Sequence, residues 1–145
     1  MAKKKIELKR LIWQKPEMEG GRQNPSILRI TVRENETQVD LGYSAYNIYI
    51  NGGWIRIHAD TYLKDKKTGY QYKLTKAEGI PIAPLKLEFE TKTDWQYFSL
   101  FFEPLPQTDL IIDFIEPDSL VPSDNGNNFD FYGIRLNLVD AMEEY

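Results

Sequence analysis

The sequence predicts an all-β protein, an antiparallel two-sheet sandwich of immunoglobulin-like type with about nine strands. Short runs alternate apolar and polar residues, turn residues separate these runs, and no stretch is long enough for the helices that connect parallel strands. Aromatic residues make up 13% of the chain, which favours strands over helices. The length of 145 residues matches one domain over positions 1–145.

The clearest local pattern is a hairpin that turns at Glu34-Asn35. In this register the inner face carries three matched pairs: Val32 with Thr37, Ile30 with Val39, and Leu28 with Leu41. The same register sets Arg29 opposite Asp40 and Arg33 opposite Glu36. A slip of one residue would lose the apolar match and the charge match together, so the register is well specified.

The remaining strands follow from turn signals and alternation. Asn51-Gly52 favours a tight hairpin between 46–50 and 54–58, and the polar turn 65–69 joins strands at 61–63 and 70–74, with Gly69 in a left-handed conformation. The segment 79–84 is a crossing, and alternation resumes at 85–90. Residues 95–102 are apolar on both faces, which indicates a central strand, and a strand at 109–115 follows.

The two ends of the chain are also expected to be mainly strands. Phe129 and Phe131 occupy odd-numbered positions, whereas the apolar residues Ile134, Leu136 and Leu138 occupy even-numbered ones. The two sets can share one face of a strand only if a residue is inserted between them, which predicts a β-bulge near Tyr132-Gly133. Ile6 to Ile12 mark a first strand, and only Leu138 to Tyr145 have the pattern of a short helix. Residues 1–33 hold nine Lys/Arg against three Asp/Glu, whereas residues 103–145 hold one against ten. We expect these opposite charges to draw the first and last strands together.

Composition narrows the functional classes. The chain has no cysteine, which excludes disulfides, thiol nucleophiles and thiolate zinc sites. Its basic end comes without a stacking platform or a recognition helix, so we expect no nucleic-acid partner. No apolar run approaches membrane length, so we expect no membrane insertion. Residues 1–10 are too charged for a signal peptide, and a cell-envelope location is expected only if a signal was removed.

Aromatic residues are the main candidates for ligand binding. Trp54, Tyr46, Tyr49 and Trp95 would form a flat platform for a sugar ring if they faced solvent, together with Trp13 and Tyr43. At alternating positions in strands, however, aromatic side chains are more often packed in the core.

Two carboxylates and one histidine are the candidates for catalysis. Asp113 and Glu116 are a pair of the kind that glycosidases use, although residues three apart on a strand face opposite sides. His58 is the only histidine, and it lies in no recognisable catalytic motif. Structural roles for all three residues are the alternative, and we expect no catalytic residues.

A polar loop offers hard oxygen donors for a metal ion. Asp124, Asn128 and Asp130 are ligands of the kind that calcium prefers, but Gly126 stands where the EF-hand loop requires Asp or Asn. A solvated turn is the alternative, and the sequence implies no cofactor.

Strand and turn residues over about 27–138 resemble an uncharacterised bacterial immunoglobulin-like accessory domain that is often found beside thioredoxin-like domains in envelope proteins. The segments that carry the resemblance are 37–41, 54–57, 61–63, 69–74, 79–80, 98–106, 113–116 and 129–136. The resemblance implies a fold and carries over no catalytic residue. It also implies either a stand-alone member or an excised domain.

These observations predict a non-enzymatic interaction or accessory module whose partner is a protein or a neighbouring domain. A carbohydrate-binding module that uses exposed aromatic side chains is the first alternative. A hydrolase that uses Asp113 and Glu116 is the second.

Overall fold

The computed structural model describes residues 9–44, 54–83, 85, 87–88, 95–118 and 128–144. Across these residues the protein is all-β, and a 3₁₀ turn, η2 (Leu138–Asp140), is its only helical element. No helix of the described residues is long and apolar enough to cross a membrane. The strands are β1 (Arg10–Gln14), β2 (Gly20–Gly21), β3 (Ser26–Val32), β4 (Thr37–Ser44), β5 (Trp54–Ile55), β6 (Tyr62–Asp65), β7 (Gln71–Glu78), β8 (Leu87–Glu88), β9 (Trp95–Phe102), β10 (Leu110–Ile115), β11 (Phe131–Leu136) and β12 (Met142–Glu144).

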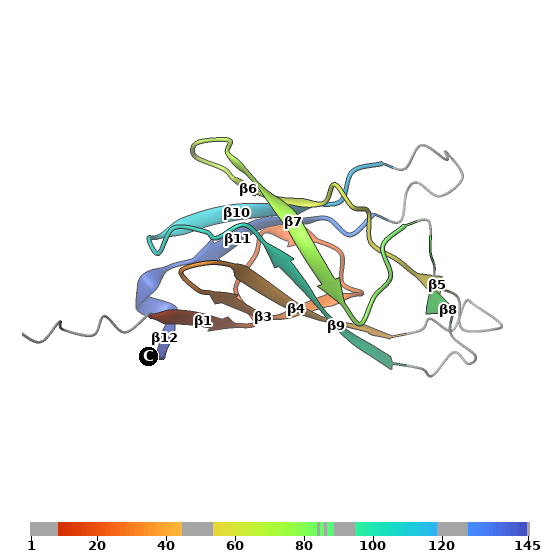
Figure 1. Cartoon of the computed structure of the whole chain (residues 1–145). Helices are drawn as coiled ribbons and strands as arrows, with labels where there is room; N and C mark the ends of the chain where they lie inside the picture. The colour runs from red at the N-terminus through yellow and green to blue at the C-terminus, as the bar shows by residue number, and fades with distance from the viewer. Residues whose placement is uncertain are drawn as a thin grey trace, which may run out of the picture.

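Ten of the strands form one antiparallel sheet in the order β12-β1-β3-β4-β9-β7-β6-β10-β11-β2 (Figure 1). The pair β5 and β8 is separate. The number of strands exceeds the expected nine or so because β2, β5 and β8 contain only two residues each.

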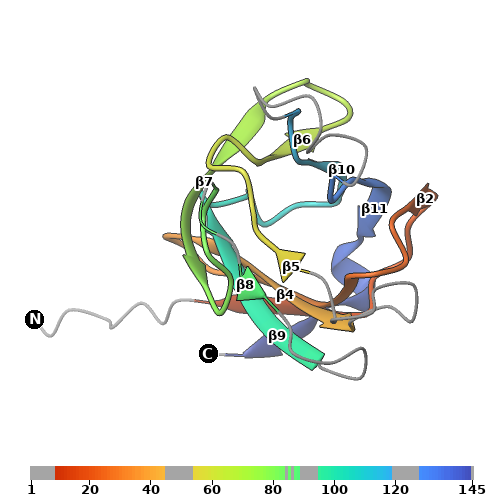
Figure 2. The same ribbon diagram turned by 90° about the vertical axis from the view of Figure 1, so that its right-hand side faces the viewer.

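The sheet bends at β7, which changes its partner along its length. Residues 71–73 of β7 pair with β6, whereas Leu74 to Glu78 pair with β9, and the register shifts between Leu74 and Lys76. Figure 2 shows the consequence: β6, β10 and β11 lie across from β1, β4 and β9, with β7 at the bend. One sheet therefore has two halves that face each other.

Aliphatic and aromatic side chains fill the space between the two halves, and aromatic rings contact one another across it. The ring of Phe102 on β9 meets the ring of Phe114 on β10 edge to face, with 5.7 Å between the ring centres. Phe129 precedes β11, and the centre of its ring lies 6.3 Å from the ring centre of Phe98 and 6.5 Å from that of Tyr43. Because these contacts join residues far apart in the sequence, the core depends on the bend.

The predicted register of the β3–β4 hairpin is confirmed over four residue pairs, from Arg29 with Asp40 to Val32 with Thr37. The expected pairing of Leu28 with Leu41 is wrong, because Ile27 takes that place and Leu28 forms a bulge. The carbonyl of Leu28 instead accepts a hydrogen bond from the amide of Lys15 on the other side.

The predicted bulge near the last long strand is confirmed. Tyr132 and Gly133 together oppose Asp113, since Ile112 pairs with Ile134 and Phe114 pairs with Phe131. The Gly133 amide donates to Oδ1 of Asp113 at 2.8 Å, and Gly133 has a φ of 63°. A residue with a side chain would be strained in this left-handed conformation.

The structure also confirms the β6–β7 hairpin, the left-handed Gly69, and the central position of β9 between β4 and β7. The predicted turn at Asn51-Gly52 lies outside the described residues. The strand that was expected to follow it is short, and β5 pairs with β8.

The two ends of the chain meet as expected. β12 pairs with β1, and the ion pairs Lys9–Glu143 and Arg10–Glu144 measure 2.8 and 2.9 Å. The expected helix over Leu138 to Tyr145 is wrong: after the 3₁₀ turn the chain extends, and its backbone hydrogen bonds go to β1.

Replacing Gly133 with alanine tests the bulge. We expect Gly133→Ala to lower the free energy of unfolding by about 1–2 kcal/mol, because an L-residue is strained at positive φ. The matched control is Gly20→Ala on the neighbouring strand β2, where an added Cβ has no atom within 4 Å. Urea denaturation followed by circular dichroism measures both, and an equal effect of the two substitutions would contradict the strained bulge.

Candidate functional site

The candidate site lies on the outer face of β3, β4 and β9, the face turned away from the core. Along β4 the side chain of Val39 is fully buried, so its neighbour Asp40 points outward. The β4–β9 register then places Ser99 beside Asp40 and Tyr97 beside Gly42. Neighbouring strands therefore bring these side chains together from distant parts of the sequence.

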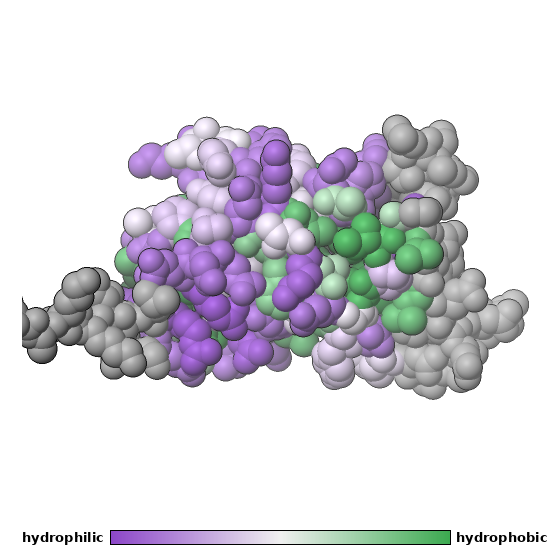
Figure 3. Space-filling view, in the orientation of Figure 1, coloured by the Kyte–Doolittle hydropathy of each residue, from purple (hydrophilic) through white to green (hydrophobic). Residues whose placement is uncertain are grey.

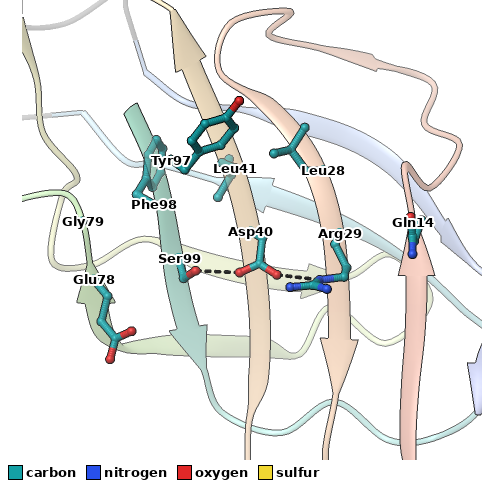
Figure 4. A pocket seen from close by; sticks show the side chains of 10 residues that line it. All are labelled: Gln14, Leu28, Arg29, Asp40, Leu41, Glu78, Gly79, Tyr97, Phe98 and Ser99. Carbon is teal, nitrogen blue, oxygen red and sulfur yellow. Dashed lines mark hydrogen bonds and ion pairs between the residues drawn. The ribbon is translucent and has the colours of Figure 1, made fainter. Parts of the chain in front are cut away.

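A groove with a volume of about 550 Å³ runs over this face. Its polar walls come from five neighbouring strands: Gln14 on β1, Arg29 on β3, Asp40 on β4, Ser99 on β9 and Glu78 on β7 (Figure 4). A volume of this size is within the range of small-molecule sites, roughly 300–1,000 Å³.

Asp40 is the centre of a hydrogen-bond network on the groove floor. Its Oδ1 accepts from the Ser99 hydroxyl at 2.6 Å and from the Gln38 amide at 2.8 Å. Its Oδ2 accepts from Nε of Arg29 at 2.9 Å. Arg33 extends the network, since its Nη1 donates to Oε1 of Gln38 at 2.9 Å. Each side chain is thus held in a fixed direction.

This network lowers the pKa of Asp40. Burial on its own would raise the pKa, but the hydrogen bonds from Ser99, Arg29 and Gln38, together with the positive charge of Arg29, outweigh it. Asp40 is therefore ionised at neutral pH, and its charge is balanced by Arg29.

Two exposed aromatic side chains mark one part of this face: Tyr97 lines the groove, and Trp95 stacks on Tyr97. Trp95 is 61% exposed and Tyr97 is 67% exposed, and their rings stack with 6.3 Å between centres and 18° between planes. Gly42 leaves room for Tyr97, because a Cβ at this position would lie 3.3 Å from atoms of Tyr97 and of Leu28. The chain thus keeps a large aromatic surface in contact with water.

The aromatic residues that the sequence suggests for ligand binding lie in different environments in the structure. Trp13 and Tyr43 are buried in the core, as the alternative of core packing requires. Of the predicted platform, Trp95 is exposed beside the groove. The backbone of Trp54 pairs in β5, but its side chain and all of Tyr46 and Tyr49 lie outside the described residues. A ligand-binding role for these residues stays a prediction.

Sequence reasoning missed Tyr97, although its position two residues after Trp95 on the same strand places both on one face. It also treated Arg29 and Asp40 only as a charge pair that fixes register. Neither Ser99 nor Gln14 carries a signal in the sequence that links it to the site.

Asp113 and Glu116 take part in different backbone contacts. Asp113 accepts the Gly133 amide at the bulge. Glu116 is 8% exposed, and its two carboxyl oxygens accept the amides of His58 and Phe129 at 2.8 and 2.9 Å. Burial raises the pKa of Glu116, and the two amide hydrogen bonds offset part of that rise. Both carboxylates therefore accept backbone amides from other segments of the chain.

The candidate metal ligands also make structural contacts. Oδ1 of Asp130 accepts the amide of Glu116 at 2.9 Å, and the side-chain amide of Asn128 donates to Oδ1 of Asp118 at 2.6 Å. Asp124 lies outside the described residues. Among the residues that are described, no three acidic or histidine side chains are grouped so as to hold a metal ion.

The low pKa of Asp40 gives a pH-dependent prediction. Ionised Asp40 stabilises the folded protein above its unfolded pKa of about 3.9, and this contribution is lost as pH falls through the lower folded-state pKa. We expect Asp40→Asn to lower the free energy of unfolding at pH 7 by on the order of 1 kcal/mol, and the deficit to shrink as the pH falls below about 4. Urea denaturation at a series of pH values measures this. Asp60→Asn, in an exposed turn, is the control, and a pH-independent deficit for Asp40→Asn would contradict the network.

Fluorescence quenching tests the positions of the tryptophans. We expect Trp95→Phe to lower the fraction of emission that acrylamide quenches, because Trp95 is exposed. Trp13→Phe should raise that fraction, because Trp13 is 3% exposed and its Nε1 donates to the Asn137 carbonyl in a part-buried hydrogen bond. The outward position of Trp95 is wrong if its removal leaves the quenched fraction unchanged.

Comparison with known proteins finds no matching family model, no matching curated protein and no matching solved structure, so the candidate site rests on the geometry of this chain alone.

Proposed function

We propose that the chain is a non-enzymatic binding module with an immunoglobulin-like two-sheet sandwich fold, and that the groove beside Trp95 and Tyr97 is its ligand site. The antiparallel pairing, the two facing halves and the change of partner along β7 support the sandwich, because strands that pass between sheets are typical of such folds. This is also the fold that the resemblance to a bacterial accessory domain implies.

The observation that carries the proposal is the exposed pair of Trp95 and Tyr97. Large aromatic side chains gain free energy when they are covered, and Trp and Tyr are enriched among residues that dominate binding. Two such rings stacked at the edge of a groove, with oriented polar groups next to them, are a favourable surface for a ligand.

The hydrogen bonds and the lowered pKa of Asp40 favour a role in binding over a role in catalysis. Three donors already contact its carboxylate, and its pKa is lowered, so it is a poor acceptor for a substrate proton at neutral pH. The described residues that line the groove include no histidine. We therefore assign Asp40 the task of orienting Arg29 and Ser99.

A protein or neighbouring-domain partner remains the second candidate, and a separate surface favours it. Ile82 and Leu85, in the segment after β7, are 38% and 69% exposed. Figure 3 shows apolar side chains gathered on this part of the molecule. Exposed apolar patches commonly mark sites of contact with other proteins.

A screen that assumes no ligand class tests the groove. A glycan microarray and a displayed peptide library are probed with the wild type and with a double variant, Trp95→Ala with Tyr97→Ala. We expect ligands of the wild type to bind the double variant at least tenfold more weakly, since truncating a central aromatic residue costs on the order of 2 kcal/mol.

Tyr70→Ala is the control for this screen, because Tyr70 is an exposed aromatic residue that packs on Tyr72 away from the groove. Ligands that bind the double variant as well as the wild type would show that the site lies elsewhere. The absence of any ligand in both libraries would count against a binding module at this groove.

A further inference from the structure

We propose that the ligand of this groove is an uncharged polysaccharide, with one sugar ring on the Trp95–Tyr97 pair and its hydroxyl groups on the polar groove floor. This inference rests on the proposed function, because it names the ligand class of the same site.

The aromatic pair supplies the apolar contact that a sugar needs. One face of a pyranose ring consists of C–H groups, which pack against the negative face of an aromatic ring. Trp95 and Tyr97 are both more than half exposed and nearly parallel, so at least one ring face is open to such a contact. Gly42 leaves room for the ring of Tyr97, because a Cβ at this position would lie 3.3 Å from Cε1 of that ring.

The groove floor supplies hydrogen bonds with fixed directions. Arg29 uses Nε for Asp40, and none of its hydrogen bonds to described residues involves its two terminal nitrogens. Gln14 and Glu78 add an amide and a carboxylate on the neighbouring strands (Figure 4). Donors and acceptors therefore alternate across the floor, which suits hydroxyl groups because each hydroxyl both donates and accepts.

Charge balance indicates an uncharged ligand. The charge of Asp40 is met by Arg29 at 2.9 Å, and the charge of Glu78 is met by Lys76 at 3.2 Å. Lys76 also lies over the ring of Phe101, 4.2 Å from its centre. The charged side chains among the described residues that line the groove are Arg29, Asp40 and Glu78, so these residues present no excess of positive charge that would attract an acidic polysaccharide or a nucleic acid.

The position of these charges also disfavours a protein ligand in the groove. The centre of a protein interface is depleted in charged residues, because covering an ion pair with apolar surface removes its hydration. Here Arg29 and Asp40 lie in the middle of the groove. A sugar would replace the lost water with hydroxyl groups, so the pair would stay hydrogen-bonded.

The groove lies on the surface of the sheet and crosses five strands, from β1 to β7. An enclosed site would favour a single sugar unit. An open site accepts a unit in the interior of a longer chain, because both chain ends can leave the groove. We therefore infer a polymeric ligand.

Affinity gel electrophoresis tests this inference. The full chain is run through native gels that contain soluble uncharged polysaccharides, namely hydroxyethyl cellulose, xyloglucan, galactomannan, laminarin and soluble starch, and through gels with polygalacturonate as the acidic comparison. Retarded pairs are then titrated by fluorescence. We expect retardation by at least one uncharged polysaccharide, with a dissociation constant that changes less than twofold between 50 mM and 1 M NaCl.

The variants Trp95→Ala and Tyr97→Ala should each weaken that binding at least tenfold, and Arg29→Gln should weaken it severalfold. Tyr70→Ala should leave it unchanged. Circular dichroism and thermal unfolding show whether each variant is folded, and the substitutions at Trp95 and Tyr97 should be tolerated because both side chains are exposed.

The remaining outcomes separate the two proposals. If displayed peptides bind through Trp95 and Tyr97 but no uncharged polysaccharide does, the sugar inference is overturned and the binding module stands. Retardation only by polygalacturonate, abolished by salt, would also overturn the inference. If a polysaccharide binds equally well to the wild type and to both aromatic variants, the groove is not its site and the sugar inference is overturned. The proposed function fails as well when no displayed peptide binds through Trp95 and Tyr97.

Discussion

The rest of the structure depends on one strand, β7, which pairs with β6 through its first three residues and with β9 through the remainder. A flat sheet of ten strands would leave its apolar face in water. The shift of register between Leu74 and Lys76 lets the sheet bend, and Thr75 donates its hydroxyl to the carbonyl of Phe101 at this point. The bend brings Phe102 against Phe114 and closes the core.

Because the core closes on one face of β4 and β9, alternate residues of these strands point into the core and away from it. Inward side chains such as Val39 and Leu100 are fully buried, and their neighbours must face water or a ligand. On β9 three of these neighbours are Trp95, Tyr97 and Ser99, so a strand at the centre of the sheet presents both an aromatic surface and a polar group. The core and the candidate site are therefore two faces of the same strands.

The sequence predicts much of this fold and less of the site, for physical reasons. The register of β3 with β4 and the bulge at Tyr132-Gly133 could be read from local alternation. The bend at β7 could not, because it also requires Leu74 to Glu78 to pair with β9, and these two segments are distant in the sequence. The site could not be predicted either, because it also depends on segments that are distant in the sequence. Gln14, Asp40 and Ser99 come to line one groove only when β1, β3, β4 and β9 lie side by side in the sheet.

Leu28 shows how a local departure from the pattern shapes the site. Alternation with Ile30 and Val32 would place Leu28 in the core, but Ile27 competes for the same position opposite Leu41 and takes it. The bulge turns Leu28 to the outer face, where it lines the groove and approaches Gly42. The error in the expected pairing therefore has a structural reason: the bulge removes Leu28 from the position opposite Leu41, and Leu28 lines the groove together with Tyr97 instead.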